Sequence, residues 1–212
     1  MRDESDAIQE VHDRLQRGDQ HALAELFSRY RDRLQRLVEF RLDARLRRRV
    51  STSDVLQEAY IAALQRLPHY RADRGMPFFL WLRWVTVQRL IEVHRQHFGT
   101  RARDATKEVP IGHGEASAAG SIQMAEPIGE FTSPSQAAQR SETLMQLQQA
   151  LDRLDPSDRE ILALRHFEEL SNHEVAAVLG IQSAAASKRY VRALERLKDA
   201  LAQMPGFERG GP

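Results

Sequence analysis

The stretch LSNHEVAAVLGIQSAAASKRYVRALERL, residues 170–197, decides the fold of the C-terminal part of the chain. It contains two short helical patterns with Gly180 between them. Ser171 is followed three residues later by Glu174, a capping-box pattern that predicts the start of a helix. Glycine permits the left-handed turn that closes such a helix. A capped helix, a glycine turn and a second helix have the spacing of a helix-turn-helix.

The second helix of this stretch offers a surface suited to DNA. Short side chains at its start would let the helix end approach the floor of the major groove, and bases further along would neutralise phosphates. Its charges are Lys188, Arg189, Arg192, Arg196 and Lys198 against Glu195 and Asp199. The predicted core of the helix-turn-helix is Val175, Leu179, Ile181, Ala186, Val191 and Leu194. The alternative is a solvated charged face on an amphipathic packing helix.

Apolar residues at helical spacing also fill the chain upstream of this stretch. They predict one helix that stops at Gly18, a second that Asp19 caps, and a third that starts near residues 51–53 and ends at Pro68. Pro77 is expected to open a helix that stops at Gly99. No alternating runs of β-branched residues are present, so the predicted fold class is all-α.

The composition of the sequence changes between residues 101 and 132. Glycines and prolines interrupt every period there and apolar residues are sparse, which predicts a flexible linker, with a short helix near residues 116–125 left open. Helices resume after Ser133, and Asp155 before Pro156 repeats the signal of a cap followed by proline. The expected organisation is two small helical domains, residues 1–100 and 133–204, joined by a linker at 101–132.

Composition excludes several classes of protein. The 212 residues, 42% hydrophobic and 29% charged, suit a soluble globular chain, and the net charge of +1 says nothing about partners. The absence of cysteine excludes disulfides, a thiol nucleophile and thiolate zinc sites. The acidic start is unlike a signal peptide, and no apolar stretch approaches the roughly 18 residues of a membrane span. We therefore expect a cytoplasmic protein without membrane insertion.

Residues 66–103 combine many arginines with interleaved aromatic residues. Arginines can follow a nucleic-acid backbone while flat rings stack on unpaired bases, so this part suits single-stranded nucleic acid. The alternative for the rings is core packing, and the loop HYRADRGM, residues 69–76, is a better place to hold a base. The basic run at residues 45–49 is either a phosphate-facing patch or a solvated helix end.

Asp54, Gln57 and Glu58 share one helical face by their spacing. They are acidic and polar within a basic half of the chain. Because such a face would repel DNA, it indicates a protein partner with a basic surface.

These segments, in this order, resemble an extracytoplasmic-function (ECF) sigma factor of bacterial RNA polymerase. Their sequence motifs are similar to those of a planctomycete-like variety. The resemblance rests on SDVLQEAYIAALQRLPHY, MPFFLWLRWVTVQRLIEVHR, LDRLDPSDREILALRHFEELSNHEVAAVLGI and SKRYVRALERL, and covers about residues 20–99 and 140–201. It implies an alternative sigma factor that binds core RNA polymerase, at the clamp coiled coil and the flap, and directs transcription from promoter DNA. The competing interpretation is a stand-alone helix-turn-helix transcription regulator.

The resemblance also implies roles for individual residues. Polymerase binding falls on Asp54, Leu56, Gln57 and Glu58. Binding of the minus-ten element falls on Tyr70, Arg71, Asp73, Arg74, Arg83, Gln88 and Arg89. Binding of the minus-thirty-five element falls on Ser183, Ser187, Lys188, Arg189, Arg192 and Arg196. An anti-sigma protein is a further partner that the family allows, although no residue here argues for one.

The chain departs from the family pattern in three places. In the first, Phe79-Leu80 stands where the family usually has Ser-Thr before Trp-Leu, so apolar packing is expected there. Gln182 to Ala186 replaces the more polar start of the recognition helix that is usual in the family, and the linker is longer than usual. No phosphate-binding glycine loop, nucleophile elbow or metal set is evident. The pairs His94 and His97, and His166 and His173, are expected to be surface or packing residues, so no cofactor, metal or catalytic residue is predicted.

Overall fold

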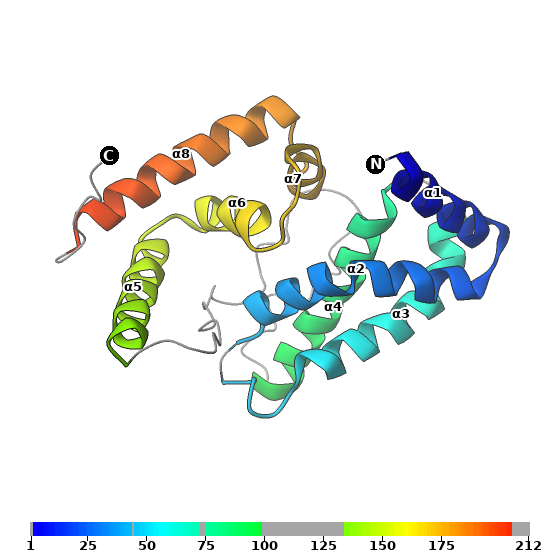
Figure 1. Cartoon of the computed structure of the whole chain (residues 1–212), viewed down its shortest axis with the longest axis horizontal. Coiled ribbons are helices and arrows are strands. Elements are labelled where there is room, and N and C mark those ends of the chain that lie inside the picture. The colour runs from blue at the N-terminus through cyan, green and yellow to red at the C-terminus, as the bar shows by residue number, and fades with distance from the viewer. Residues whose placement is uncertain (1, 44, 73–74, 99–133, 205–212) are drawn as a thin grey trace. The chain divides into compact units, whose positions relative to one another are not determined.

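We describe residues 2–43, 45–72, 75–98 and 134–204 of a computed structural model of the chain. These ranges are helical and contain no strand, which agrees with the predicted all-α class (Figure 1). The helices are α1 (Arg2–Arg17), α2 (Gln20–Arg41), α3 (Thr52–Ala72), α4 (Phe78–Phe98), α5 (Pro134–Asp152), α6 (Pro156–His166), α7 (Asn172–Leu179) and α8 (Ser183–Ala202). The predicted linker and the short helix left open at residues 116–125 lie outside the described residues.

The described residues form two compact units. The first contains α1, α2 up to Val38, α3 and α4, and the second contains Glu39–Ala44 together with α5 to α8. The short segment Glu39–Ala44 is a feature of the second unit that the sequence pattern does not indicate.

In the first unit, α3 and α4 pack side by side (Figure 1). The start of α4 is buried on all sides, since five consecutive side chains there are almost fully covered: Phe78, Phe79, Leu80, Trp81 and Leu82. A helix with no polar side at its start belongs inside a core. Most of the aromatic residues of this part therefore hold the unit together.

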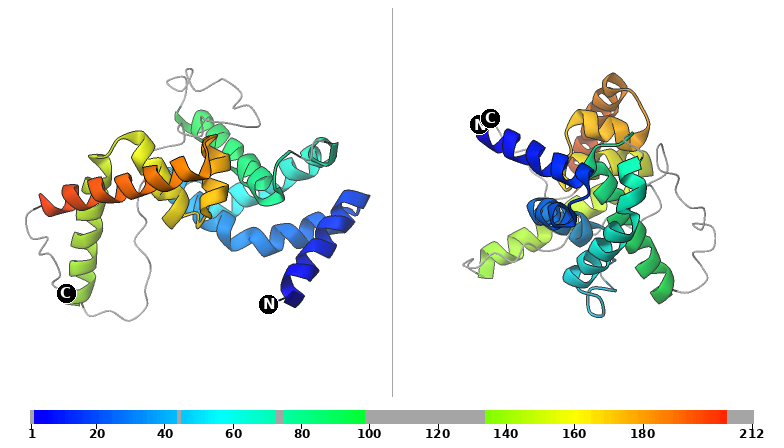
Figure 2. Two further views of the ribbon diagram at one scale, coloured as in Figure 1. Left: turned by 90° about the horizontal axis from the view of Figure 1, so that it is seen from above. Right: turned by 90° about the vertical axis from the view of Figure 1, so that its right-hand side faces the viewer.

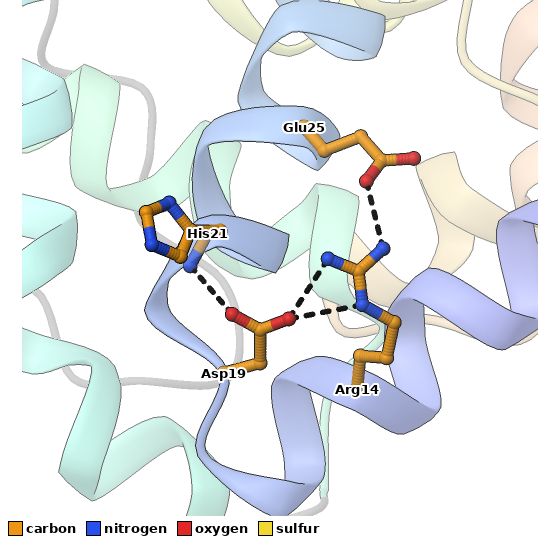
Figure 3. Close-up of polar contacts among 4 residues, drawn as sticks. All are labelled: Arg14, Asp19, His21 and Glu25. Carbon is orange, nitrogen blue, oxygen red and sulfur yellow. Dashed lines mark hydrogen bonds and ion pairs between the residues drawn. The ribbon is translucent and has the colours of Figure 1, made fainter.

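The turn between α1 and α2 is held by a cluster of charged side chains (Figure 3). Arg14 donates to Asp19 through Nε at 2.9 Å and to Glu25 through Nη1 at 3.1 Å. Asp19 also accepts the backbone N–H of His21 at 2.9 Å, as expected for a residue that caps α2. Hydrogen bonds from Arg14 and from the His21 backbone lower the pKa of Asp19. Gly18, with φ of +101°, supplies the turn where the sequence places it.

The prediction that Pro68 ends the third helix is wrong, because α3 continues through Pro68 to Ala72. Proline removes one backbone hydrogen bond, a loss that tertiary contacts of the following turn can offset. Tyr70 stacks on Trp81 at 4.5 Å between ring centroids, and Arg71 donates to the backbone carbonyl of Gln16 at 2.9 Å. These two contacts anchor the last turn of α3 to other helices of the first unit.

In the second unit, α6, α7 and α8 pack on one another, and α5 crosses the C-terminal end of α8 (Figures 1 and 2). The predicted capping box is present, with Ser171 Oγ accepting the backbone N–H of Glu174 at 3.2 Å and Glu174 accepting that of Ser171 at 2.8 Å. Gly180 closes α7 with φ of 65°, as expected. The second unit therefore contains the capped helix, glycine turn and following helix predicted for residues 170–197.

Two details of the second unit differ from the sequence-based expectation. Asp155 occupies the N-cap position of α6, but its side chain makes no capping hydrogen bond. Val191, predicted to lie in the core, is 51% exposed. The inner side of α8 is lined instead by Ala186, Ala193 and Ala200, which recur every seven residues.

A buried ion pair ties Glu39–Ala44 to the second unit. Arg41 donates to Glu168 through Nε at 2.7 Å and to Glu160 through Nη2 at 2.7 Å. Phe40 stacks on Phe167 beside it, with 4.0 Å between ring centroids. Burial alone would lower the pKa of Arg41, but the charges of Glu168 and Glu160 outweigh it and raise that pKa. Arg41 is therefore a charged residue inside the unit.

Candidate protein-binding and nucleic-acid-binding surfaces

The solvent side of α3 carries the acidic face predicted from the sequence. Asp54, Gln57 and Glu58 are all exposed. Asp54 has a second task, because its carboxylate accepts the backbone N–H of Ser51 at 3.1 Å while its own N–H donates to Ser51 Oγ at 3.1 Å. Hydrogen bonds from the Ser51 side chain and backbone lower the pKa of Asp54. Asp54 thus stabilises the start of α3, whereas Gln57 and Glu58 are placed on the surface without such a role.

The apolar side chain exposed on this part of α3 is Ile61 and not Leu56, which the resemblance implied in polymerase binding. Leu56 is buried, so its side chain supports α3 from inside. Ile61 is 48% exposed and follows Asp54 by seven residues and Glu58 by three, which places it on the same helical face. The three- and seven-residue spacing of Ile61 from the acids is the sequence signal that identifies it. The exposed face of α3 is defined here as Asp54, Gln57, Glu58 and Ile61.

The end of α3 presents fewer free groups than expected. Burial and the neighbouring Tyr30 raise the pKa of Tyr70 to about 12. The Tyr70 ring packs against the rings of Trp81 and Phe78. Arg71 is tied to the Gln16 carbonyl and lies against Gly18. Tyr70 and Arg71 thus belong to the last turn of α3, so the first part of the loop expected at residues 69–76 is helical. Asp73 and Arg74 lie outside the described residues.

Helix α4 turns only part of its predicted residues toward solvent. Arg83 is 4% exposed, which removes it from the surface. Arg89 pairs with Glu92 at 2.5 Å, and Gln88 is half-buried. Trp84 is also half-buried and lies one turn before Gln88, with the guanidinium of Arg66 5.6 Å from its ring centroid. The buried Nε1 of Trp84 and Nε2 of Gln88 have no hydrogen-bond partner among the described residues.

The start of α8 presents an exposed surface opposite the alanines of its inner side. Ser187, Lys188 and Arg192 are exposed there, and Arg189 is half-buried. Ser183 is exposed at the first position of the helix, where its backbone carbonyl accepts the side-chain amide of Asn172 at 2.9 Å. That hydrogen bond joins α7 to the start of α8, so the helix-turn-helix holds its second helix at both the glycine turn and the helix start.

Arg196 differs from the other bases of α8. Its guanidinium forms an ion pair with the buried carboxylate of Asp158 and lies 3.6 Å from Asp155 Oδ2. Hydrogen bonding to Asp158 and the charges of both acids raise the pKa of Arg196. The arginine joins α8 to α6, a role that sequence spacing does not reveal because the partners lie 38 residues apart.

The histidines singled out in the sequence make local contacts. His166 Nε2 and the Tyr190 hydroxyl share a hydrogen bond of 3.0 Å, and His97 Nδ1 lies 3.0 Å from the Val93 carbonyl. Within the described residues, no group of three or more His, Asp or Glu side chains is placed to hold a metal ion. No helix in those ranges is long and apolar enough to cross a membrane.

Comparison with known proteins identifies relatives over most of the chain. A family model described as "ECF sigma factor" matches residues 4–203. The ECF RNA polymerase sigma factor SigD of Mycobacterium tuberculosis (strain ATCC 25618 / H37Rv) is 30% identical over 184 residues, which cover 87% of this chain and 79% of SigD. The RNA polymerase sigma-H factor of Pseudomonas aeruginosa is 29% identical over 194 residues, 91% of this chain and 93% of that protein.

A solved structure shares the arrangement of the helices. The structure titled as CnrH in complex with the cytosolic domain of CnrY superposes with a TM-score of 0.53 over 93% of this chain and 99% of that chain, at 22% identity. At this identity the likeness concerns the fold.

Proposed function

This chain belongs to the ECF sigma factor family, and from that membership we propose how its surfaces divide the work of a sigma factor. The protein is an alternative sigma factor that binds core RNA polymerase and directs promoter-specific transcription initiation. The observation that carries this function is the family match over residues 4–203, which includes both units. A stand-alone helix-turn-helix regulator would need only the second unit.

The first unit is proposed to dock on core polymerase through the exposed face of α3. The acids and amide of this face favour a basic partner surface, and Ile61 adds an apolar contact at its C-terminal end. Leu56 acts from below by fixing the helix. The clamp coiled coil is the expected polymerase element for this face, and the flap is the expected element for the second unit.

The end of α3 and the middle of α4 are proposed to bind the minus-ten element. Tyr70 and Arg71 lie in the last turn of α3, shortly before Asp73 and Arg74 in the chain, and Gln88 and Arg89 lie on α4. Arg83, which is buried, is proposed to support α4 from inside. Trp84 joins this surface, because it is half-buried on α4 one turn before Gln88.

The second unit is proposed to read the minus-thirty-five element with the start of α8. Ser183, Ser187, Lys188, Arg189 and Arg192 lie where a recognition helix meets the major groove. Arg196 is proposed to position α8 on α6 and to add at most a phosphate contact. The mechanism is binding rather than catalysis and takes place in the cytoplasm, with residues 101–132 as the link between the units.

Run-off transcription tests this function. Core polymerase would be combined with DNA from upstream of the chain's own gene, with and without the protein. A transcript with a defined start that requires the protein is expected. Failure to produce a transcript together with failure to bind core polymerase would contradict the proposed division of roles.

A further inference from the structure

Val191 is the exposed apolar side chain of the recognition helix α8. At 51% exposure it stands out from Ala186 and Ala193, which are fully buried on the inner side of the same helix. A single exposed valine is common on protein surfaces and by itself needs no explanation. Its neighbours give it significance, because Lys188 precedes it by three residues and Arg192 follows it directly, and both are exposed.

We propose that Val191 contacts the 5-methyl group of a thymine in the major groove of the minus-thirty-five element, a proposal that rests on the function proposed for the second unit. The bases on either side favour a polyanionic occupant over an apolar protein surface. Within the major groove of DNA, the thymine methyl is the apolar group that base pairs present, and apolar side chains read it.

The other groups at the start of α8 strengthen this assignment. Ser183 and Ser187 are short, and Ala184 and Ala185 between them carry no polar group. Arg196, a long donor further along, is committed to Asp158. The side chains left to form paired hydrogen bonds, Lys188, Arg189 and Arg192, are of the kind that distinguishes guanine and not thymine. An apolar contact supplies part of the specificity that these side chains lack.

Replacing thymine with deoxyuridine removes the 5-methyl group and leaves the hydrogen-bonding edge unchanged, which makes it the direct test. Promoter DNA with single deoxyuridine substitutions across the minus-thirty-five element would be titrated with the holoenzyme of full-length chain and core polymerase. We expect one position at which the substitution weakens binding about fourfold, the effect of one lost methyl contact. The variant Val191→Ala should bind thymine and deoxyuridine at that position equally.

Controls separate the possible outcomes. Met145→Ala also truncates an exposed apolar side chain of the second unit, on α5, and should keep the full sensitivity to deoxyuridine. Val191→Thr retains one methyl group and should keep part of the sensitivity to deoxyuridine. If no position is sensitive, or if Val191→Ala keeps the same sensitivity as the native chain, the assignment is overturned. If the native chain binds core polymerase but the resulting holoenzyme binds no promoter, the function proposed for the second unit fails as well.

If Val191→Ala weakens binding to core polymerase itself, the side chain faces protein and not DNA, which also overturns the proposal. A circular dichroism spectrum and melting curve of the variant are needed beside the titration. Because Val191 is exposed, both are expected to match those of the native chain.

Discussion

Glu58 and Asp54 lie on one face of α3 but differ in what their removal would do. Glu58→Ala should weaken binding to core polymerase by up to about fivefold, because exposed ion pairs contribute ~0.2–1 kcal/mol. It should leave the melting temperature unchanged. Asp54→Ala should lower both the affinity for core polymerase and the melting temperature, since Asp54 also caps α3 through Ser51. Affinity for core polymerase and thermal unfolding, measured on both variants, check this difference.

Glu142→Ala, an exposed acid on α5, is the matched control for the loss of one negative charge. An equal effect of Glu142→Ala and Glu58→Ala on polymerase binding would show that overall charge matters and the α3 face does not.

Arg192 and Arg196 lie one helical turn apart on α8 and should give opposite results when replaced by alanine. Arg192→Ala should weaken promoter binding by the holoenzyme and reduce the slope of log affinity against log salt by about 0.9, the loss of one phosphate contact. Arg196→Ala should instead lower thermal stability, because it leaves the buried carboxylate of Asp158 without its cation. Salt titrations and melting curves of both variants test this difference. A larger change of slope for Arg196→Ala than for Arg192→Ala would contradict it.

At the scale of the helix, Ser171 tests how much the capping box contributes to the recognition unit. Ser171→Ala removes the acceptor for the Glu174 N–H and should lower the free energy of unfolding of the second unit by ~1 kcal/mol. Chemical denaturation followed by circular dichroism measures this change. Ser157→Ala, an exposed serine in the first turn of α6, is the control and should have little effect. Equal effects of the two variants would argue against the capping role.

The helices show where sequence patterns succeed and where they fail. The capping box at Ser171 and the turns at Gly18 and Gly180 depend on nearby residues, so the sequence predicts them and the structure contains them. Pro68 was misjudged because contacts from distant helices hold the turn that follows it. Val191 was misplaced because its apolar character was counted without the seven-residue repeat of buried alanines that sets the inner side of α8.

The candidate surfaces were predictable to the same extent. The spacing of Asp54, Gln57 and Glu58 is local, and all three are exposed as expected. Arg83 and Arg196 looked like phosphate contacts from composition, but burial of the first and the ion pairs of the second depend on neighbours that sequence spacing does not bring together.

At the scale of the whole molecule, Arg41 shows that the second unit depends on a residue from far upstream. Its partners Glu160 and Glu168 lie 119 and 127 residues away, so no local pattern reveals the contact. Arg41→Ala should destabilise the second unit by ~3–5 kcal/mol, because it removes the buried cation that pairs with two buried carboxylates. Chemical denaturation measures the effect, with exposed Arg48→Ala as control. If the two variants unfold alike, Arg41 is not part of the stable unit.

The distribution of DNA-binding groups over two units leads to the last prediction, which concerns the free chain. The chain has 31 Lys and Arg against 30 Asp and Glu, so it lacks the overall positive charge that would hold it on DNA. Each unit offers only a small set of exposed bases. A small site gains affinity when a second site on the same partner is held at the right distance, because the second contact then forms at a high effective concentration. Polymerase is expected to supply that distance.

The free chain should therefore bind a promoter duplex at least tenfold more weakly than the holoenzyme does, and its binding should depend little on which promoter is used. Fluorescence anisotropy of a labelled promoter, titrated with the chain and then with the holoenzyme, measures both affinities in one buffer. A duplex with a scrambled minus-thirty-five element reports the sequence-independent part. Tight, promoter-specific binding by the free chain would contradict this prediction, because the recognition helix would then act without polymerase as it does in a stand-alone regulator.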